Sequence, residues 1–284
     1  MPAEHDTVAP GAPDDAFRFG ENWQQYVSRY FNPERERIAS ESLVGLLDTD
    51  LTGKYFLDIG AGSGLFSLCA HKLGASRVVS VDVDPESVES CNNLREMCGD
   101  PEGWEVLHGS ILDPALLDEL DPADVVYSWG VLHHTGDMYR AIENASRLVA
   151  PDGIFAIAIY NRVTSGFLNS DRWLRIKRAY NHSSRPAREA VLALYEGYWF
   201  AKELRHGRNP IRTAANYKQS RGMAVRTDLR DWLGGYPYEY ATADEIARFC
   251  EGLGLRTIKV LPVPGAGTGN NEFVFSANSS SRST

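Results

Sequence analysis

An acid and three glycines at alternate positions form the stretch of this sequence whose spacing points most directly to chemistry. The segment FLDIGAGSGLF places Asp58 at the end of an apolar run, and Gly60, Gly62 and Gly64 follow it. A strand that breaks into such a turn lets a nucleotide-like ligand approach the backbone. The dinucleotide fingerprint G-x-G-x-x-G is not matched, because Leu65 occupies the position of its third glycine. The spacing therefore disfavours a nicotinamide dinucleotide.

A second acid lies where a nucleoside could be held. Asp82 follows the apolar run VVSV within the segment VVSVDVD, 22 residues after Gly60. A carboxylate there can accept hydrogen bonds from both hydroxyls of a ribose. Because several cofactors share adenosine, Asp82 alone does not distinguish among them. Asp84 precedes Pro85 and is expected to cap a helix.

Four motifs in order resemble those of class I S-adenosylmethionine-dependent methyltransferases. They are FLDIGAGSG, VVSVDVD, HGSILD and DVVYSWGVLHHTGDMYRAIENASRLVAPDGIFAIAIYN, across residues 56–160. The last is similar to small-molecule methyltransferases of the quinone-biosynthesis type. The resemblance implies S-adenosylmethionine as cofactor and S-adenosylhomocysteine as product. The cofactor-binding residues that it implies are Asp58, Gly60, Gly62, Gly64, Asp82, Val83, Gly109, Ser110, Ile111, Ser128 and Trp129.

The third motif departs from the family pattern. Ser110 stands where the family has an acid that reaches the adenine amino group. Gly109, Ser110 and Ile111 are therefore expected at the adenine edge, with a hydroxyl in place of a carboxylate. Val83 is expected to offer the adenine an apolar face.

Two histidines follow the fourth apolar run. Unperturbed imidazole titrates near pH ~6.5 and can accept a proton at neutrality. His133 and His134 are thus the candidates for a catalytic base toward a hydroxyl acceptor, although adjacent side chains rarely point the same way and one of the pair is expected to orient the loop. A structural or cofactor contact is the alternative role for His133. No metal is expected, because His133, His134 and Asp137 are poorly spaced for one.

The elements that must position these residues alternate between short apolar runs and helical segments, which is typical of an α/β, Rossmann-like doubly wound sheet. A closing hairpin makes the last strand antiparallel. The expected strands are Tyr55–Ile59, Arg77–Val81, Trp104–His108, Val125–Ser128, Ile154–Tyr160, Leu255–Leu261 and Glu272–Ser276.

The chain divides around this sheet. Residues 54–161 and 242–277 are expected to form the cofactor-binding core, preceded by an N-terminal helical cap over 17–53. Residues 162–241 are expected to form a helical insertion that acts as a substrate lid. The ends, 1–16 and 278–284, are polar and are expected to be disordered tails.

Acceptor-binding candidates come from the strand ends and from these helical additions. In an open parallel sheet, ligands sit beyond the carboxyl ends of the strands. The candidates are Trp23, Tyr26, Tyr160, Tyr238, Asn270, Asn271 and Glu272. Within the insertion, apolar residues at 191, 194, 195, 198 and 201 are expected to pack as one helix face. A basic run (Arg212, Lys218, Arg221 and Arg226) is either a solvated surface or a site for an anionic acceptor.

Composition narrows the partners. A net charge of −9 and a pI near 5.3 argue against a nucleic-acid partner. No apolar stretch reaches the ~18 residues of a membrane span, and a cytoplasmic location is expected. A homodimer is compatible with the sequence. The predicted function is methyl transfer to a small-molecule acceptor, at oxygen first. The alternatives are an enzyme that methylates a tRNA base or peptide, and a non-catalytic cofactor-binding or scaffold protein.

Overall fold

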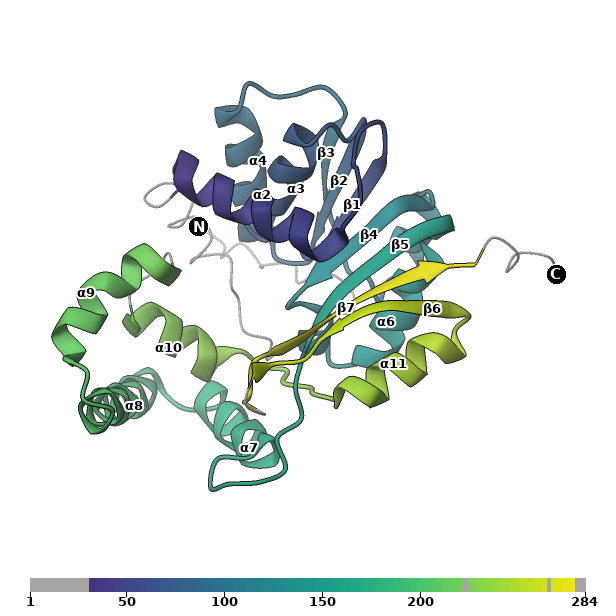
Figure 1. The fold of residues 1–284 in the computed structure, drawn as a ribbon. Coiled ribbons are helices and arrows are strands. Elements are labelled where there is room, and N and C mark those ends of the chain that lie inside the picture. Colours follow the sequence, from purple (N-terminus) through teal and green to yellow (C-terminus); the bar gives the residue numbers. More distant parts are fainter. Residues whose placement is uncertain (1–30, 222–224, 265–266, 279–284) are drawn as a thin grey trace, which may run out of the picture.

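A seven-stranded sheet organises the computed structural model of this protein, which describes residues 31–221, 225–264 and 267–278 (Figure 1). The strand order is β3-β2-β1-β4-β5-β7-β6. The pairings from β3 to β5 are parallel, and β7 is antiparallel to both of its neighbours. This topology confirms the predicted Rossmann-like sheet. The strands are β1 (Tyr55–Ile59), β2 (Arg77–Asp82), β3 (Trp104–His108), β4 (Ala123–Trp129), β5 (Val149–Tyr160), β6 (Leu255–Leu261) and β7 (Asn270–Ala277).

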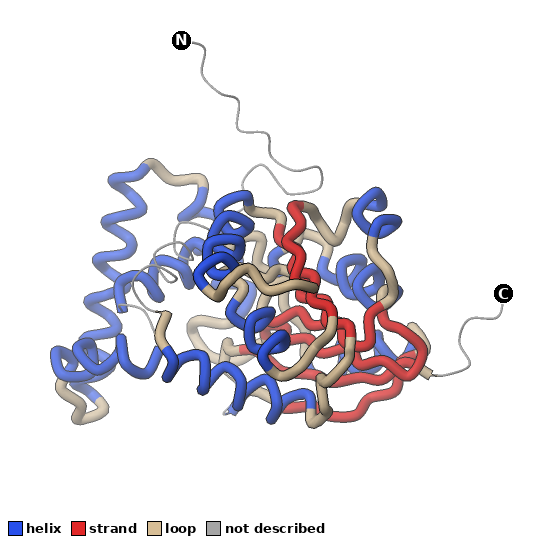
Figure 2. The backbone as a smooth tube through the Cα atoms, turned by 90° about the horizontal axis from the view of Figure 1, so that it is seen from above, coloured by secondary structure: helices blue, strands red, loops and turns tan. Residues whose placement is uncertain are grey.

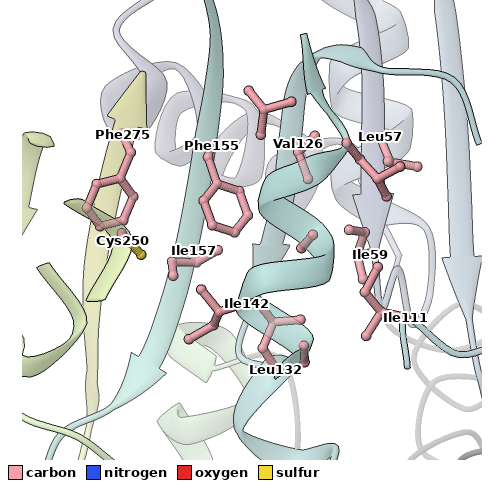
Figure 3. Close-up of a cluster of buried hydrophobic side chains, with 14 of the residues drawn as sticks. Leu57, Ile59, Ile111, Val126, Leu132, Ile142, Phe155, Ile157, Cys250 and Phe275 are labelled. Atoms are coloured by element: carbon pink, nitrogen blue, oxygen red, sulfur yellow. The ribbon is translucent and has the colours of Figure 1, made fainter. Parts of the chain in front are cut away.

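Helices cover both faces of the sheet because its central strands are apolar on both sides. Along β1, Phe56 packs on one face and Leu57 on the other, and both are fully buried. The Phe56 face carries α2 (Pro33–Leu47), α3 (Leu65–Lys72) and α4 (Pro85–Met97). The Leu57 face carries α5 (Pro114–Glu119), α6 (Met138–Arg147) and α11 (Ala243–Gly252). Figure 3 shows part of this second core, with Leu57, Ile142 and Phe155.

Side-chain caps set where several of these helices begin. The carboxylates of Asp84, Asp113 and Asp137 accept backbone N–H bonds at the starts of α4, α5 and α6. Asp84 is thus the cap that its position before Pro85 predicts. Thr242 and Glu245 form a reciprocal capping box at the start of α11.

Strand β5 is longer than expected. It begins at Val149 instead of Ile154, because Val149 pairs with Ala123 before a register shift in β4. Asp152 adopts a positive φ of 60° within this irregular stretch. The turn signal PDG therefore marks a distortion inside the strand and not its start.

The insertion lies beyond the carboxyl ends of the parallel strands as a separate helical layer (Figure 1), and Figure 2 shows helices standing to one side of the strands. It contains α7 (Ser170–Asn181), α8 (Arg185–Arg205), α9 (Pro210–Arg221) and α10 (Val225–Gly234). These helices enclose their own apolar cluster, against which Tyr160 at the end of β5 packs. In the ranges that the structure describes, no helix has both the length and the apolar composition to cross a bilayer.

The expected apolar face of α8 is wrong in part. Leu192 is its fully buried residue, and Tyr195 and Trp199 are partly buried beside it. Leu194 and Tyr198 are 76% and 53% exposed. The buried face is narrow because α8 packs only along one side, against neighbouring insertion helices, and the remaining apolar side chains face outward.

Candidate active site

The glycine turn after β1 requires glycine at each of its three positions. Gly60, Gly62 and Gly64 all have positive φ, at 77°, 55° and 78°. A Cβ on Gly60 would lie 2.3 Å from Val131 Cγ1, and one on Gly64 would lie 2.5 Å from Cys91 Sγ. The turn is therefore a backbone cradle that leads into α3 and packs between α4 and the loop after β4.

Asp82 lies beside this cradle and is held by it. Gly62 N donates to Asp82 Oδ2 and Asp84 N donates to Asp82 Oδ1, both at 2.9 Å. Each carboxylate oxygen keeps a second lone pair, which suits a pair of ribose hydroxyls. Burial raises the pKa of Asp82 to about 6 against the effect of these two bonds. The carboxylate is ionised at neutral pH and is oriented before any ligand arrives.

Asp58 and Ser128 lie under the cradle instead of lining it. Asp58 is buried, and Ser67 Oγ donates to its Oδ2 at 2.6 Å. Burial raises the pKa of Asp58 to about 7, and the nearby Asp82 adds to the effect. Ser128 Oγ donates to Ile59 O at 2.8 Å and so ties the end of β4 to the end of β1.

The residues predicted at the adenine edge divide between ligand-facing and structural positions. Gly109 N donates to Asp82 O at 2.9 Å, which brings the end of β3 beside β2. Ser110 Oγ accepts from Leu112 N at 3.2 Å, and the side chain of Ile111 is buried in the core. Val83 remains partly exposed at this end of β2. Val83 and the 109–110 backbone are thus the groups available to an adenine.

A family model described as a methyltransferase domain matches residues 57–157, the stretch that holds the cradle, Asp82 and the strand ends. Residues 57–157 are a methyltransferase domain. It is of the class I type, and its cofactor is S-adenosylmethionine. The turn fits this group because its three glycines carry no side chain between the backbone and a ligand, and because the oriented carboxylate of Asp82 lies next to it.

Sequence relatives cover only parts of the chain. One of them, a ribosomal protein L11 methyltransferase from Tolumonas auensis, is 33% identical over 113 residues, which are 38% of this chain and 35% of that protein. The chain spans less than half of the length of the curated relatives it matches.

Solved structures share the fold over most of the chain. An O-methyltransferase family protein from Burkholderia thailandensis is 14% identical with a TM-score of 0.53, covering 92% of this chain and 59% of that one. A magnesium protoporphyrin IX methyltransferase from Synechocystis PCC 6803, with bound S-adenosylhomocysteine, is 13% identical with a TM-score of 0.53, covering 92% and 96%. At these identities the likeness establishes the fold.

On the other side of the methyltransferase cradle, β4 and β7 bring polar groups together. Trp129 is 42% exposed at the end of β4, and its indole N–H donates to Glu272 Oε1 at 2.8 Å. Asn270 pairs with Tyr160 in register, and its Oδ1 is buried without a hydrogen-bond partner among the described residues. The hairpin loop thus reaches the same edge as the strand ends, as the sequence predicts.

Asn271 has a different role from its two neighbours. Its Oδ1 accepts from Val263 N at 3.0 Å, and its Nδ2 donates to Asn161 Oδ1 at 3.1 Å. Because side chains alternate along a strand, Asn271 points to the opposite face of the sheet from Asn270 and Glu272. It therefore shapes the loop between β6 and β7.

Both histidines are engaged in structural contacts. His133 is completely buried, and its Nδ1 accepts from Tyr160 N at 3.3 Å. In a neutral ring this bond assigns the proton to Nε2, which is buried without a hydrogen-bond partner among the described residues, and burial lowers the pKa of His133 well below its usual value. His134 Nδ1 is 2.5 Å from Pro237 O, and burial lowers its pKa to about 3. These contacts favour positioning over proton abstraction, and the base assignment stays a prediction.

An aromatic cluster joins the histidine loop to the insertion. The Tyr160 ring lies 3.9 Å from that of His133, 5.3 Å from that of Tyr238 and 5.7 Å from that of Trp232, between centroids. Tyr238 is buried within this cluster, so it packs against Tyr160 and is not exposed to an acceptor in the described conformation. Trp23 and Tyr26 lie outside the described residues.

Several contributors were not predicted from the sequence. Lys177 is fully buried, donates to Trp232 O, and lies over the rings of Trp232 and Tyr238 at 4.0 and 4.8 Å from their centroids. Glu239 N donates to His133 O at 3.0 Å, and its carboxylate accepts from Met138 N. Neither residue has a local signal, because a charged side chain within WLRIKRAY or YPYEYA is expected to be exposed. The described residues contain no cluster of three or more His, Cys, Asp or Glu side chains placed for a metal ion.

Proposed function

We propose that the protein transfers the methyl group of S-adenosylmethionine to a small-molecule acceptor, at oxygen in the first instance. One observation carries the proposal. The Trp129–Glu272 pair lies at the same sheet edge as the glycine cradle and Asp82, and the insertion packs onto Tyr160 at that edge. An exposed indole next to a carboxylate suits an acceptor with a flat apolar body and a hydroxyl.

The chemistry of the transfer asks mainly for alignment. The cofactor supplies a methyl group on a good neutral leaving group, so holding the acceptor oxygen in line with it can provide much of the acceleration. Glu272 and Asn270 present hydrogen-bond acceptors at the strand ends for the acceptor hydroxyl. His133 and His134 would contribute by fixing Tyr160 and the 237–239 turn.

Charge distribution in the insertion disfavours tRNA as acceptor. Arg226 forms ion pairs with Glu189 and Glu196, and Arg230 forms one with Glu189. Paired guanidinium groups do not make the wide basic surface that a phosphate backbone requires. The side chains of Lys218 and Arg221 lie outside the described residues.

A protein acceptor is the second candidate, and the sequence relatives favour it. The Tolumonas auensis relative is named a ribosomal protein L11 methyltransferase, and its match spans 113 residues, which are 38% of this chain. Cofactor-binding domains are shared among enzymes with different acceptors. The acceptor must therefore be decided by experiment.

Labelling of a cell extract separates these candidates. We expect the purified protein, incubated with a bacterial extract and methyl-labelled S-adenosylmethionine, to place the label in the fraction that passes a 3-kDa filter (about the size of a short peptide). The matched control is Asp82→Asn, which keeps the shape of the cradle and lowers cofactor occupancy. Label that is retained with protein would support the second candidate, and binding without label transfer to either fraction would support a non-catalytic role.

A further inference from the structure

A chain of hydrogen bonds runs through the buried Phe56 face of the sheet and ends on Asp58. The indole Nε1 of Trp104 donates to Ser80 Oγ at 2.8 Å, Ser80 Oγ lies 2.7 Å from Ser67 Oγ, and Ser67 Oγ donates to Asp58 Oδ2 at 2.6 Å. All four side chains are at most 3% exposed. They come from β3, β2, α3 and β1, and Ser80 and Asp58 are register partners on adjacent strands.

The two ends of the chain determine the direction of every bond in it. An indole N–H can only donate, and an ionised carboxylate can only accept. Ser80 therefore accepts from Trp104 and donates to Ser67, and Ser67 donates to Asp58. Each hydroxyl points its proton toward the carboxylate, and buried hydrogen bonds in series polarise one another. Burial raises the pKa of Asp58 and favours its protonated form, whereas this series of hydrogen bonds favours the ionised form.

We propose that Trp104, Ser80 and Ser67 form a positioning relay that favours the ionised form of Asp58 beneath the glycine turn, where its charge favours binding of the cationic cofactor. S-adenosylmethionine carries a sulfonium and an ammonium group, so a negative charge under the cradle attracts it. The inference rests on the cofactor part of the proposed function and is independent of the acceptor. The relay residues act through Asp58 and are not ligand contacts.

Few groups near Asp58 change their charge near pH 7, where Asp58 itself titrates. The described groups that interact electrostatically with it are Asp82 on β2, Tyr127 on β4, Cys69 on α3 and Cys91 on α4. Burial raises the pKa of Tyr127 well above its usual value and those of Cys69 and Cys91 to about 11 and about 12. All three stay neutral near pH 7. Asp82, with its pKa raised to about 6, is the other charge to account for.

The test is a direct titration of Asp58 in the apo protein. Carboxyl carbons of labelled aspartates are followed by NMR against pH, and Asp58→Asn assigns the resonance. Ser67→Ala removes the last donor of the relay. The hydrogen bond from Ser67 stabilises the ionised form of Asp58, so its loss should raise the pKa of Asp58 by about one unit. Trp104→Phe, which removes only the first donor, should give a smaller shift in the same direction.

Cofactor binding supplies a second readout that does not involve turnover. From a pKa of about 7 raised by one unit, calorimetric titration with S-adenosylmethionine should show Ser67→Ala binding about threefold more weakly at pH 7.5 and nearly equally at pH 9. Wild type and variant are compared at each pH, so that titration of the cofactor itself cancels.

Ser90→Ala is the matched control. Ser90 is a fully buried serine on α4, and its hydroxyl has no hydrogen-bond partner among the described residues. Its removal should leave the pKa of Asp58 unchanged. An unshifted Asp58 in Ser67→Ala, or equal shifts in Ser67→Ala and Ser90→Ala, would overturn the relay. If Ser67→Ala does not fold, the milder Trp104→Phe decides by the same criterion. A failed methyl transfer with a shifted pKa would count against the proposed function and leave the relay standing.

Discussion

The two sides of the site are held together in different ways. The cofactor side is built from backbone turns and from hydrogen bonds between the ends of neighbouring strands, such as the one from Gly62 N to Asp82. The acceptor side is assembled from distant segments, with Trp129 bonded to Glu272 and the β5 end packed against the insertion. Local geometry thus specifies the cofactor, whereas tertiary packing shapes the acceptor pocket. The four predictions below test this contrast, from the largest expected effect to the smallest.

Gly60→Ala should break the cofactor side. The new Cβ would meet Val131 at 2.3 Å with φ at 77°, so we expect a loss of about 2–4 kcal/mol in the free energy of unfolding. Cofactor binding should fall with it. Gly45→Ala is the control, because Gly45 lies within α2 with nothing within 4 Å of a new Cβ. That change should stabilise by about 0.5–1 kcal/mol. Urea unfolding of both variants is the measurement, and equal stabilities would contradict the prediction.

Asp82→Asn should separate binding from stability. It keeps the shape of the side chain but removes its charge, so cofactor affinity by calorimetry should weaken about 10- to 100-fold. The folded-state pKa of Asp82 is raised to about 6, above the unfolded value, so its ionisation costs stability as pH rises from about 4 to 6 and above. Asn replaces one of the two oxygens that accept backbone N–H bonds by an NH2 donor, which lowers stability at every pH. The stability of the apo variant relative to wild type should therefore be more favourable at pH 8 than at pH 4.

The control for Asp82 is a carboxylate on a neighbouring connection. Asp113 caps α5 through Ala115 N at 3.0 Å, and Asp113→Asn should leave cofactor affinity within about twofold. Unchanged affinity in Asp82→Asn would refute the ribose assignment.

Lys177→Met probes the acceptor side through stability. Burial lowers the pKa of Lys177 to about 7, so the folded state pays for a buried cation at low pH and releases the proton as pH rises. Wild-type stability from this group therefore increases between about pH 7 and the unfolded pKa of ~10.4. The melting temperature of the variant relative to wild type should be most favourable at pH 6 and least at pH 9.5. Lys202→Met, on the exposed side of α8, is the control and should show no such trend.

His133→Gln should have the smallest effect on chemistry. The imidazole is buried and neutral, with its Nδ1 committed to Tyr160 N, so turnover should fall by less than about tenfold with an unchanged pH-rate profile. The measurement is a comparison of initial rates of wild type and variant between about pH 5.5 and about pH 9. Disappearance of the acidic limb in the variant would restore His133 as the base.

Much of the cofactor side was predictable because its signals are local. Positive-φ glycines, an acid at a strand end and caps such as Asp84 each depend on a few neighbouring residues. The relay was missed because Ser67, Ser80 and Trp104 look like ordinary buried residues in the sequence, and only the packing of α3 on β1 and β2 brings them into line.

The sequence by itself determined the order of strands and helices, the parallel sheet with its antiparallel β7, and the cradle for S-adenosylmethionine. Hydrophobic periodicity and turn residues depend on a few neighbouring positions, so they can be recognised in the sequence without knowledge of the fold. Tertiary structure alone decided that His133 is buried and neutral, that Lys177 enters an aromatic cage, and which face of α8 is covered. These features depend on contacts between residues far apart in the chain, and burial, which sets both pKa and exposure, exists only once those contacts have formed.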